Sequence, residues 1–159
     1  MQAYQQCIAY PAMLLLSALS LLMGGCGEPL VGIPGGQLSG NESEAPERWS
    51  AVPDTIQVEF RPDTDPYSIN IWGVAIGPDL YIATKPQGTK WSAMLETDAQ
   101  VRARIRSELY SLQAQPVTAP EERQRVFEKY IEKYDMEFEA DWADTAPVYR
   151  LDRLDRPQP

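Results

Sequence analysis

The sequence contains no histidine and only two cysteines, Cys7 and Cys26, both near the N-terminus. The missing histidine excludes Ser-His-Asp and Cys-His nucleophile systems, histidine metal sites and the commonest general base. Because neither cysteine lies in the body of the chain, a disulfide framework, a CxxC redox pair and a thiolate zinc site are excluded there. A P-loop is also missing, since Gly88-Thr89-Lys90 has no glycine five residues upstream.

Basic residues are few. The 14 Lys and Arg against 23 Asp and Glu give a net charge of −9, which argues against nucleic acid as a partner because phosphate binding needs a basic surface. The hydrophobic share of 43% and the charged share of 23% are ordinary for a globular protein. A length of 159 residues fits one domain with additional segments.

The N-terminal segment carries an apolar run from Met13 to Met23, followed by two glycines and Cys26. The run is about half the ~20 residues that a membrane-spanning helix needs, so it is typical of the apolar part of a signal peptide. Small residues directly before a cysteine resemble the cleavage site of bacterial lipoproteins. Residues 1–25 are therefore predicted to be a lipoprotein-type signal peptide, and Cys26 the lipid-bearing first residue of an exported, membrane-attached protein.

Two features depart from that pattern. The chain before the apolar run has no Lys or Arg, and Met23 stands where lipoproteins usually have leucine. A plain secretory signal, or an uncleaved anchor helix extending back to Ile8, therefore remains an alternative.

Residues 26–50 are rich in Gly, Pro, Ser, Glu and Asn and show no apolar period. This composition predicts a flexible tether between the membrane and a folded domain over residues 51–159.

The folded part is predicted to hold six strands and two helices. Thr55–Phe60 and Val101–Arg106 alternate between apolar and polar residues, as half-buried strands do. The segments Tyr67–Ile76 and Leu80–Thr84 form a hairpin around a Gly-Pro-Asp turn. The further strands are Leu109–Val117 and Val148–Leu151; the helices are Trp91–Ala99 and a longer one after a predicted Thr118/Glu121 capping box.

This order of elements, from about Thr55 to Leu154, resembles the split β-barrel family of pyridoxamine 5′-phosphate oxidases, especially a branch of small reductases inferred from sequence whose substrate is not known. The residues that carry the resemblance are an aromatic-rich strand ending in Thr84, the short loop to Lys90, and Leu95, Asp98 and Val101–Ile105 beyond it. The resemblance implies an α+β fold, a six-stranded antiparallel split β-barrel with two helices.

The resemblance also implies a cofactor site and a homodimer. In such proteins the loop and the helix start hold the phosphate of FMN or a deazaflavin, and two subunits share the cofactor. The positions here are Thr84, Lys85, Thr89, Lys90, Trp91 and Ser92. The alternative is that the lysines are solvated and Thr89 is an ordinary helix cap.

Two departures affect this site. The central strand lacks the arginine that flavin-binding members commonly have there, and Gly88 stands where they often have a hydroxyl residue. Arg102, Arg104 and Arg106 could supply the charge, or they could form a solubilising face or a dimer edge. Trp72 and Trp91 could stack on a flavin ring, or they could be core aromatics.

Two functions remain open. One is a flavin- or deazaflavin-dependent oxidoreductase, in which the cofactor performs the hydride transfer and no histidine or cysteine is needed. The other is a non-catalytic lipoprotein that uses the barrel as a binding or interaction module. This second function is favoured because an exported protein has no ready supply of reduced nicotinamide outside the cytoplasm. Haem binding is disfavoured without histidine, and no metal site or catalytic residue is predicted.

Overall fold

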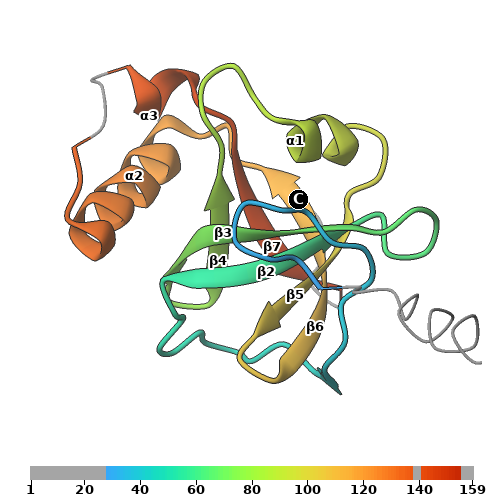
Figure 1. Cartoon of the computed structure of the whole chain (residues 1–159). Helices are drawn as coiled ribbons and strands as arrows, with labels where there is room; N and C mark the ends of the chain where they lie inside the picture. The colour runs from blue at the N-terminus through green and yellow to red at the C-terminus, as the bar shows by residue number, and fades with distance from the viewer. Residues whose placement is uncertain (1–27, 138–140, 155–159) are drawn as a thin grey trace, which may run out of the picture.

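The structure, a computed structural model, describes residues 28–137 and 141–154, and in this part six strands close into a barrel (Figure 1). The elements are β1 (Asn41–Ser43), β2 (Thr55–Phe60), β3 (Tyr67–Ile76), β4 (Asp79–Ala83), α1 (Lys90–Leu95), β5 (Gln100–Ile105), β6 (Glu108–Pro116), α2 (Pro120–Tyr134), α3 (Trp142–Thr145) and β7 (Val148–Arg153). The barrel order is β6-β5-β2-β3-β4-β7, all antiparallel, and β7 pairs with β6 to close it. Strand β1 adds to β6 in parallel. The predicted α+β barrel of six antiparallel strands is confirmed, with a short strand and a short helix in addition.

The alternating pattern of β5 sets its two faces. Val101, Ala103 and Ile105 are buried inside the barrel, and Arg102 and Arg104 point outward. The predicted hairpin is also present, because Gly77 adopts a φ of +62° between β3 and β4, a conformation that glycine reaches without a Cβ clash.

Helix α1 packs into the barrel core through Trp91 and Leu95. The indole of Trp91 stacks on Phe60, with 5.2 Å between ring centroids. The helix ends at Leu95, four residues before the predicted end. The hydroxyl of Thr97 donates to the Met94 carbonyl, and the carboxylate of Asp98 accepts from the Gln100 amide that opens β5, so local side-chain bonds replace a further helical turn.

Helix α2 covers the outer face of the barrel beside β3, as Figure 1 shows. A second apolar cluster joins Val126, Phe127 and Tyr130 of the helix to Val74 and Tyr81 of the barrel. The predicted Thr118/Glu121 capping box is wrong: the helix starts after Ala119, which makes no side-chain cap, and a proline occupies its first turn, where a missing N–H costs nothing.

The N-terminal segment differs from its prediction. The structure holds residues 28–50 against the barrel, with β1 in the sheet and Leu38 and Trp49 only 3% and 8% exposed. Buried apolar side chains and ion pairs to β5 hold this segment in place, although its composition suggested a flexible tether. The predicted signal peptide and Cys26 lie outside the described residues. Within residues 28–137 and 141–154, none of the helices has the length and apolar character needed to cross a bilayer.

Candidate ligand site beside Trp72

A hollow of about 180 Å³ lies between the outer face of the β3–β4 hairpin and helices α2 and α3. One wall of this hollow is the indole ring of Trp72. This residue is 47% exposed, and its ring stacks on Tyr134 with 4.7 Å between the ring centroids. Its lining is mostly apolar and aromatic: Trp72, Ala83, Thr84, Lys85, Phe127, Tyr130, Met136 and Trp142. Ligand pockets combine such walls with a few polar groups that fix orientation.

The polar groups of this hollow are Thr84 and Lys85. Thr84 is 7% exposed, and its hydroxyl has no hydrogen-bond partner among the described residues. Its backbone N–H is used, because it donates to the Pro147 carbonyl at 3.1 Å. A buried hydroxyl without a partner is costly. Because this oxygen has almost no accessible surface, a ligand would remove that penalty only once the Thr84 side chain turns its hydroxyl toward the hollow. Lys85 is exposed and provides a positive charge at the same place.

A second, shallower hollow of about 550 Å³ shares Trp72 and Ala83 with the first. It is bordered by Thr55, Asn70 and Ile71 of the barrel and by Val31 and Gly32 of the N-terminal segment. The smaller hollow alone is below the ~300–1,000 Å³ of small-molecule sites, and the adjoining space brings the pair into that range.

Helix α2 fixes the position of the Trp72 wall. The Tyr130 hydroxyl donates to the Trp72 carbonyl at 3.0 Å, and the Lys133 ammonium donates to the Gly73 carbonyl at 2.8 Å. Burial raises the pKa of Tyr130 far above its ordinary value, and that of Tyr134 to about 12. Both phenols therefore keep their protons and can donate at neutral pH.

The other four predicted phosphate residues lie at the start of α1 and contact groups of the protein itself. The Thr89 hydroxyl accepts from the Ser92 amide and the Ser92 hydroxyl accepts from the Thr89 amide, a reciprocal cap. The Lys90 ammonium lies 4.3 Å from the centroid of the Tyr67 ring, and Trp91 is 5% exposed in the core. The structure thus brings Thr84 and Lys85 into one hollow and places the remaining four at the helix.

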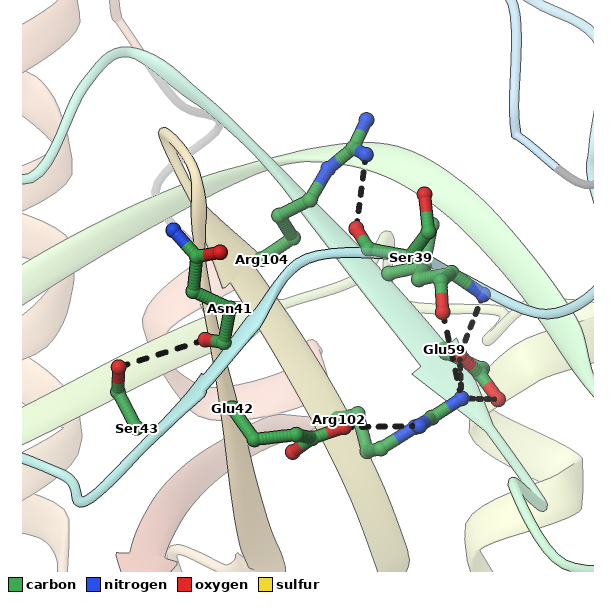
Figure 2. Close-up of polar contacts among 8 residues, drawn as sticks. Ser39, Asn41, Glu42, Ser43, Glu59, Arg102 and Arg104 are labelled. Carbon is green, nitrogen blue, oxygen red and sulfur yellow. Dashed lines mark hydrogen bonds and ion pairs between the residues drawn. The ribbon is translucent and has the colours of Figure 1, made fainter.

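The outward arginines of β5 hold the N-terminal segment (Figure 2). Arg102 Nη2 donates to both carboxylate oxygens of buried Glu59 at 2.8 Å, and Glu59 also accepts from the Leu38 amide at 2.7 Å. Arg104 pairs with Glu28 and donates to the Ser39 carbonyl. The hydrogen bonds from Arg104 lower the pKa of Glu28 to about 2. Arg106 lies instead in the β5–β6 turn with a φ of +59°.

No protein-family model matches the sequence, and no curated protein matches it significantly. Solved structures do match. A proposed pyridoxamine 5′-phosphate oxidase from Listeria innocua has a TM-score of 0.52 at 10% identity over 64% of this chain and 85% of its own.

The fold is that of the split β-barrels. A conserved hypothetical protein from Mycobacterium tuberculosis superposes on this split barrel with a TM-score of 0.52 at 16% identity, over 70% of this chain and 86% of its own. An FAD-binding protein from Mesorhizobium loti gives 0.50 at 10% identity, over 64% and 81%. At these identities the likeness concerns the fold alone.

The arrangement can bind a flat apolar ligand with one polar edge. Among the described residues of the split barrel, no group of three or more cysteines and carboxylates could hold a metal ion. Phe127, Tyr130 and Trp142 belong to the site but were not predicted there. The helical spacing of the first two indicated only that they face a core, and nothing local indicated that a gap is left beside Trp72.

Proposed function

We propose that the protein is an exported split barrel, anchored to the bacterial membrane by a lipid on Cys26, that binds the ring of a flavin or deazaflavin in the hollow beside Trp72. The observation that carries this proposal is the meeting of a half-exposed indole, an unpartnered buried hydroxyl and a lysine at one hollow. An aromatic ring can stack on the indole, Thr84 can bond to a ring heteroatom, and Lys85 can pair with a phosphate. A bound flavin supplies hydride transfer.

The fold likeness to a proposed pyridoxamine 5′-phosphate oxidase and to an FAD-binding protein supports this ligand class. The adjoining hollow supports it as well, because it offers room for the part of the ligand that the smaller hollow cannot hold.

The test is titration of the purified protein with FMN and with a deazaflavin, followed by absorbance and flavin fluorescence. Lys85→Ala should weaken binding roughly 10- to 100-fold, the scale of one charge-assisted hydrogen bond. Lys129→Ala is the matched control, since Lys129 lies on α2, outside the lining of the hollow, and pairs with the exposed Glu132 at 2.8 Å. Lys90→Ala measures whether the phosphate site extends to α1. Equal flavin affinities of the wild type and Lys85→Ala would show that the hollow beside Trp72 is not the flavin site.

The second candidate is a non-catalytic binding module. It is favoured by the contacts of Thr89, Lys90 and Ser92, which already have partners within the protein. A protein that is colourless as isolated and binds neither cofactor would overturn the flavin proposal and favour this candidate.

The anchor has its own test. Cys26→Ser should move the protein from the membrane fraction to the soluble exported fraction, while Cys7→Ser should leave it at the membrane. Membrane attachment that survives Cys26→Ser would instead indicate an uncleaved anchor helix. The homodimer stays a prediction, to be measured by sedimentation with and without flavin.

A further inference from the structure

The turn from Leu30 to Ile33 exposes three apolar side chains together. Leu30, Val31 and Ile33 are 62%, 96% and 61% exposed. The Ile33 N–H donates to the Leu30 carbonyl at 3.0 Å, and Gly32 at the tip has a φ of +77°, which favours glycine. Single exposed apolar residues are common, whereas three on one tight turn form an apolar knob that water does not favour.

The knob is held firmly on the barrel. Pro29, directly before it, is buried. The side-chain amide of Asn70 donates to the carbonyls of Pro29 and Leu30 at 3.2 and 3.1 Å. After the knob, Gly35 and Ser68 exchange two backbone hydrogen bonds at 2.8 and 2.9 Å. The exposure of Leu30, Val31 and Ile33 is therefore a property of the folded structure.

The knob also lies in an uncharged stretch of an acidic protein. No Asp, Glu, Lys or Arg occurs from Pro29 to Asn41, although the chain has a net charge of −9. Glu28, before this stretch, is paired with Arg104. The exposed indole of Trp72 borders the same hollow as Val31. Uncharged apolar side chains with a tryptophan nearby suit the boundary between lipid headgroups and acyl chains.

The position of the knob in the chain identifies the surface that covers it. Val31 comes five residues after Cys26, so the two lie at most ~18 Å apart even along a fully extended chain. We propose that the Leu30–Ile33 turn inserts into the bilayer interface beside the lipid and holds the barrel against the membrane. This inference depends on the lipid at Cys26 proposed above. Membrane attachment commonly combines a lipid with a second contact of this kind.

The test places an environment-sensitive fluorophore on Val31→Cys in the full, lipidated chain on phosphatidylcholine vesicles. Lipidation removes Cys7 with the leader and blocks Cys26, so the new cysteine is the single free thiol. We expect a blue-shifted emission that brominated phosphatidylcholine quenches. The matched control is Leu154→Cys, because Leu154 is also 61% exposed but borders a hollow with Glu44, Glu47 and Arg153; its label should report water.

The outcomes separate this inference from the anchor. Mass spectrometry of Cys26 is read first: an unmodified cysteine overturns the anchor and the knob contact with it. If Cys26 is lipidated but the fluorophore at residue 31 emits as it does in water, the knob contact is overturned and the anchor is not. A blue shift that occurs without vesicles and grows with protein concentration would show that a second copy of the chain covers the knob, which also overturns the membrane contact.

Discussion

At the scale of single residues, Glu59 joins the N-terminal segment to the barrel, two parts of the chain that the sequence composition predicted to be separate. Its carboxylate is fully buried and is satisfied by the Arg102 guanidinium and the Leu38 amide. Arg102 is itself largely shielded, with 15% of its side chain exposed. The pair therefore fastens the N-terminal segment to the outer face of β2 and β5.

Glu59→Gln should destabilise the fold by about 3 kcal/mol, because it leaves a shielded guanidinium without its closest opposite charge. The free energy of unfolding in urea measures this. The comparison is Asp65→Asn, which removes an exposed ion pair to Arg61 and should change stability by less than about 1 kcal/mol. Equal effects of the two substitutions would mean that the N-terminal segment is not held through Glu59.

The Glu28–Arg104 pair predicts a pH dependence. Hydrogen bonds from Arg104 lower the pKa of Glu28 to about 2 from an ordinary 4.5. A carboxylate with a lowered folded-state pKa adds stability above its ordinary pKa and loses it as the pH falls toward the folded value. Wild type should thus be more stable than Glu28→Gln at pH 6, by less than about 1 kcal/mol since the pair is partly exposed. Urea titrations from pH 6 to pH 3 should show the difference shrinking below about pH 4.5, and a difference that grows there would contradict the pairing.

These residues also mark the limit of prediction from the sequence. The alternation in Val101–Ile105 correctly indicated which side chains of β5 point outward. It could not indicate that Leu38 and Glu28 would cover that face, because the covering contacts join residues far apart in the chain and depend on one buried carboxylate. Composition predicted a tether because residues 26–50 are rich in Gly, Pro, Ser, Glu and Asn and show no apolar period. Leu38 and Trp49 nevertheless anchor the described part of this segment, together with its polar contacts to β5.

At the scale of elements, one lysine links α2 both to β3 and to the segment before β2, beside the tyrosine hydrogen bonds and the apolar cluster that also hold the helix. The Lys133 ammonium donates to the carbonyls of Val52, Pro53 and Gly73 at 3.0, 2.8 and 2.8 Å. Burial lowers the pKa of this lysine, opposed by nearby Asp54. Since Gly73 follows Trp72, the same contact sets one wall of the proposed ligand site.

Lys133→Met should therefore destabilise the protein by about 1–3 kcal/mol, because the Val52 and Pro53 carbonyls lose this donor while the aliphatic packing is kept. The Gly73 carbonyl keeps the Tyr134 hydroxyl as a donor. It should also loosen the Trp72–Tyr134 stack, so near-ultraviolet circular dichroism should lose aromatic signal. Lys129→Met on the same helix is the control and should change neither quantity. A stable Lys133→Met variant with an unchanged aromatic spectrum would show that α2 docks through its apolar face alone.

Element type was more predictable than the site. The six barrel strands and both longer helical segments follow from local periodicity and turns, as the hairpin at Gly77 illustrates. The hollow beside Trp72 arises where α2 and α3 meet the barrel without filling the space. That mismatch is a property of tertiary packing, so the sequence indicated core aromatics and could not indicate a gap between them.

At the scale of the whole molecule, closure of the barrel depends on the last strand. β7 pairs with β4 on one side and with β6 on the other. It also buries Leu151 and Asp152, and Arg150 of the same strand bonds to Glu122 of α2 at 3.0 Å. Removing β7 would leave two unpaired strand edges and would open the core between them, which is the condition that leads sheets to aggregate.

A chain that ends at Pro147 should therefore fail to fold and should be recovered as aggregate. A chain that ends at Leu154 keeps β7 and should unfold at the same urea concentration as the full protein. Circular dichroism and size-exclusion chromatography distinguish the two. The same comparison tests whether the barrel is one cooperative unit, since every strand in it has two neighbours and none can leave without exposing the others. A soluble, folded chain ending at Pro147 would mean instead that β6, β5, β2, β3 and β4 form a stable open sheet without β7.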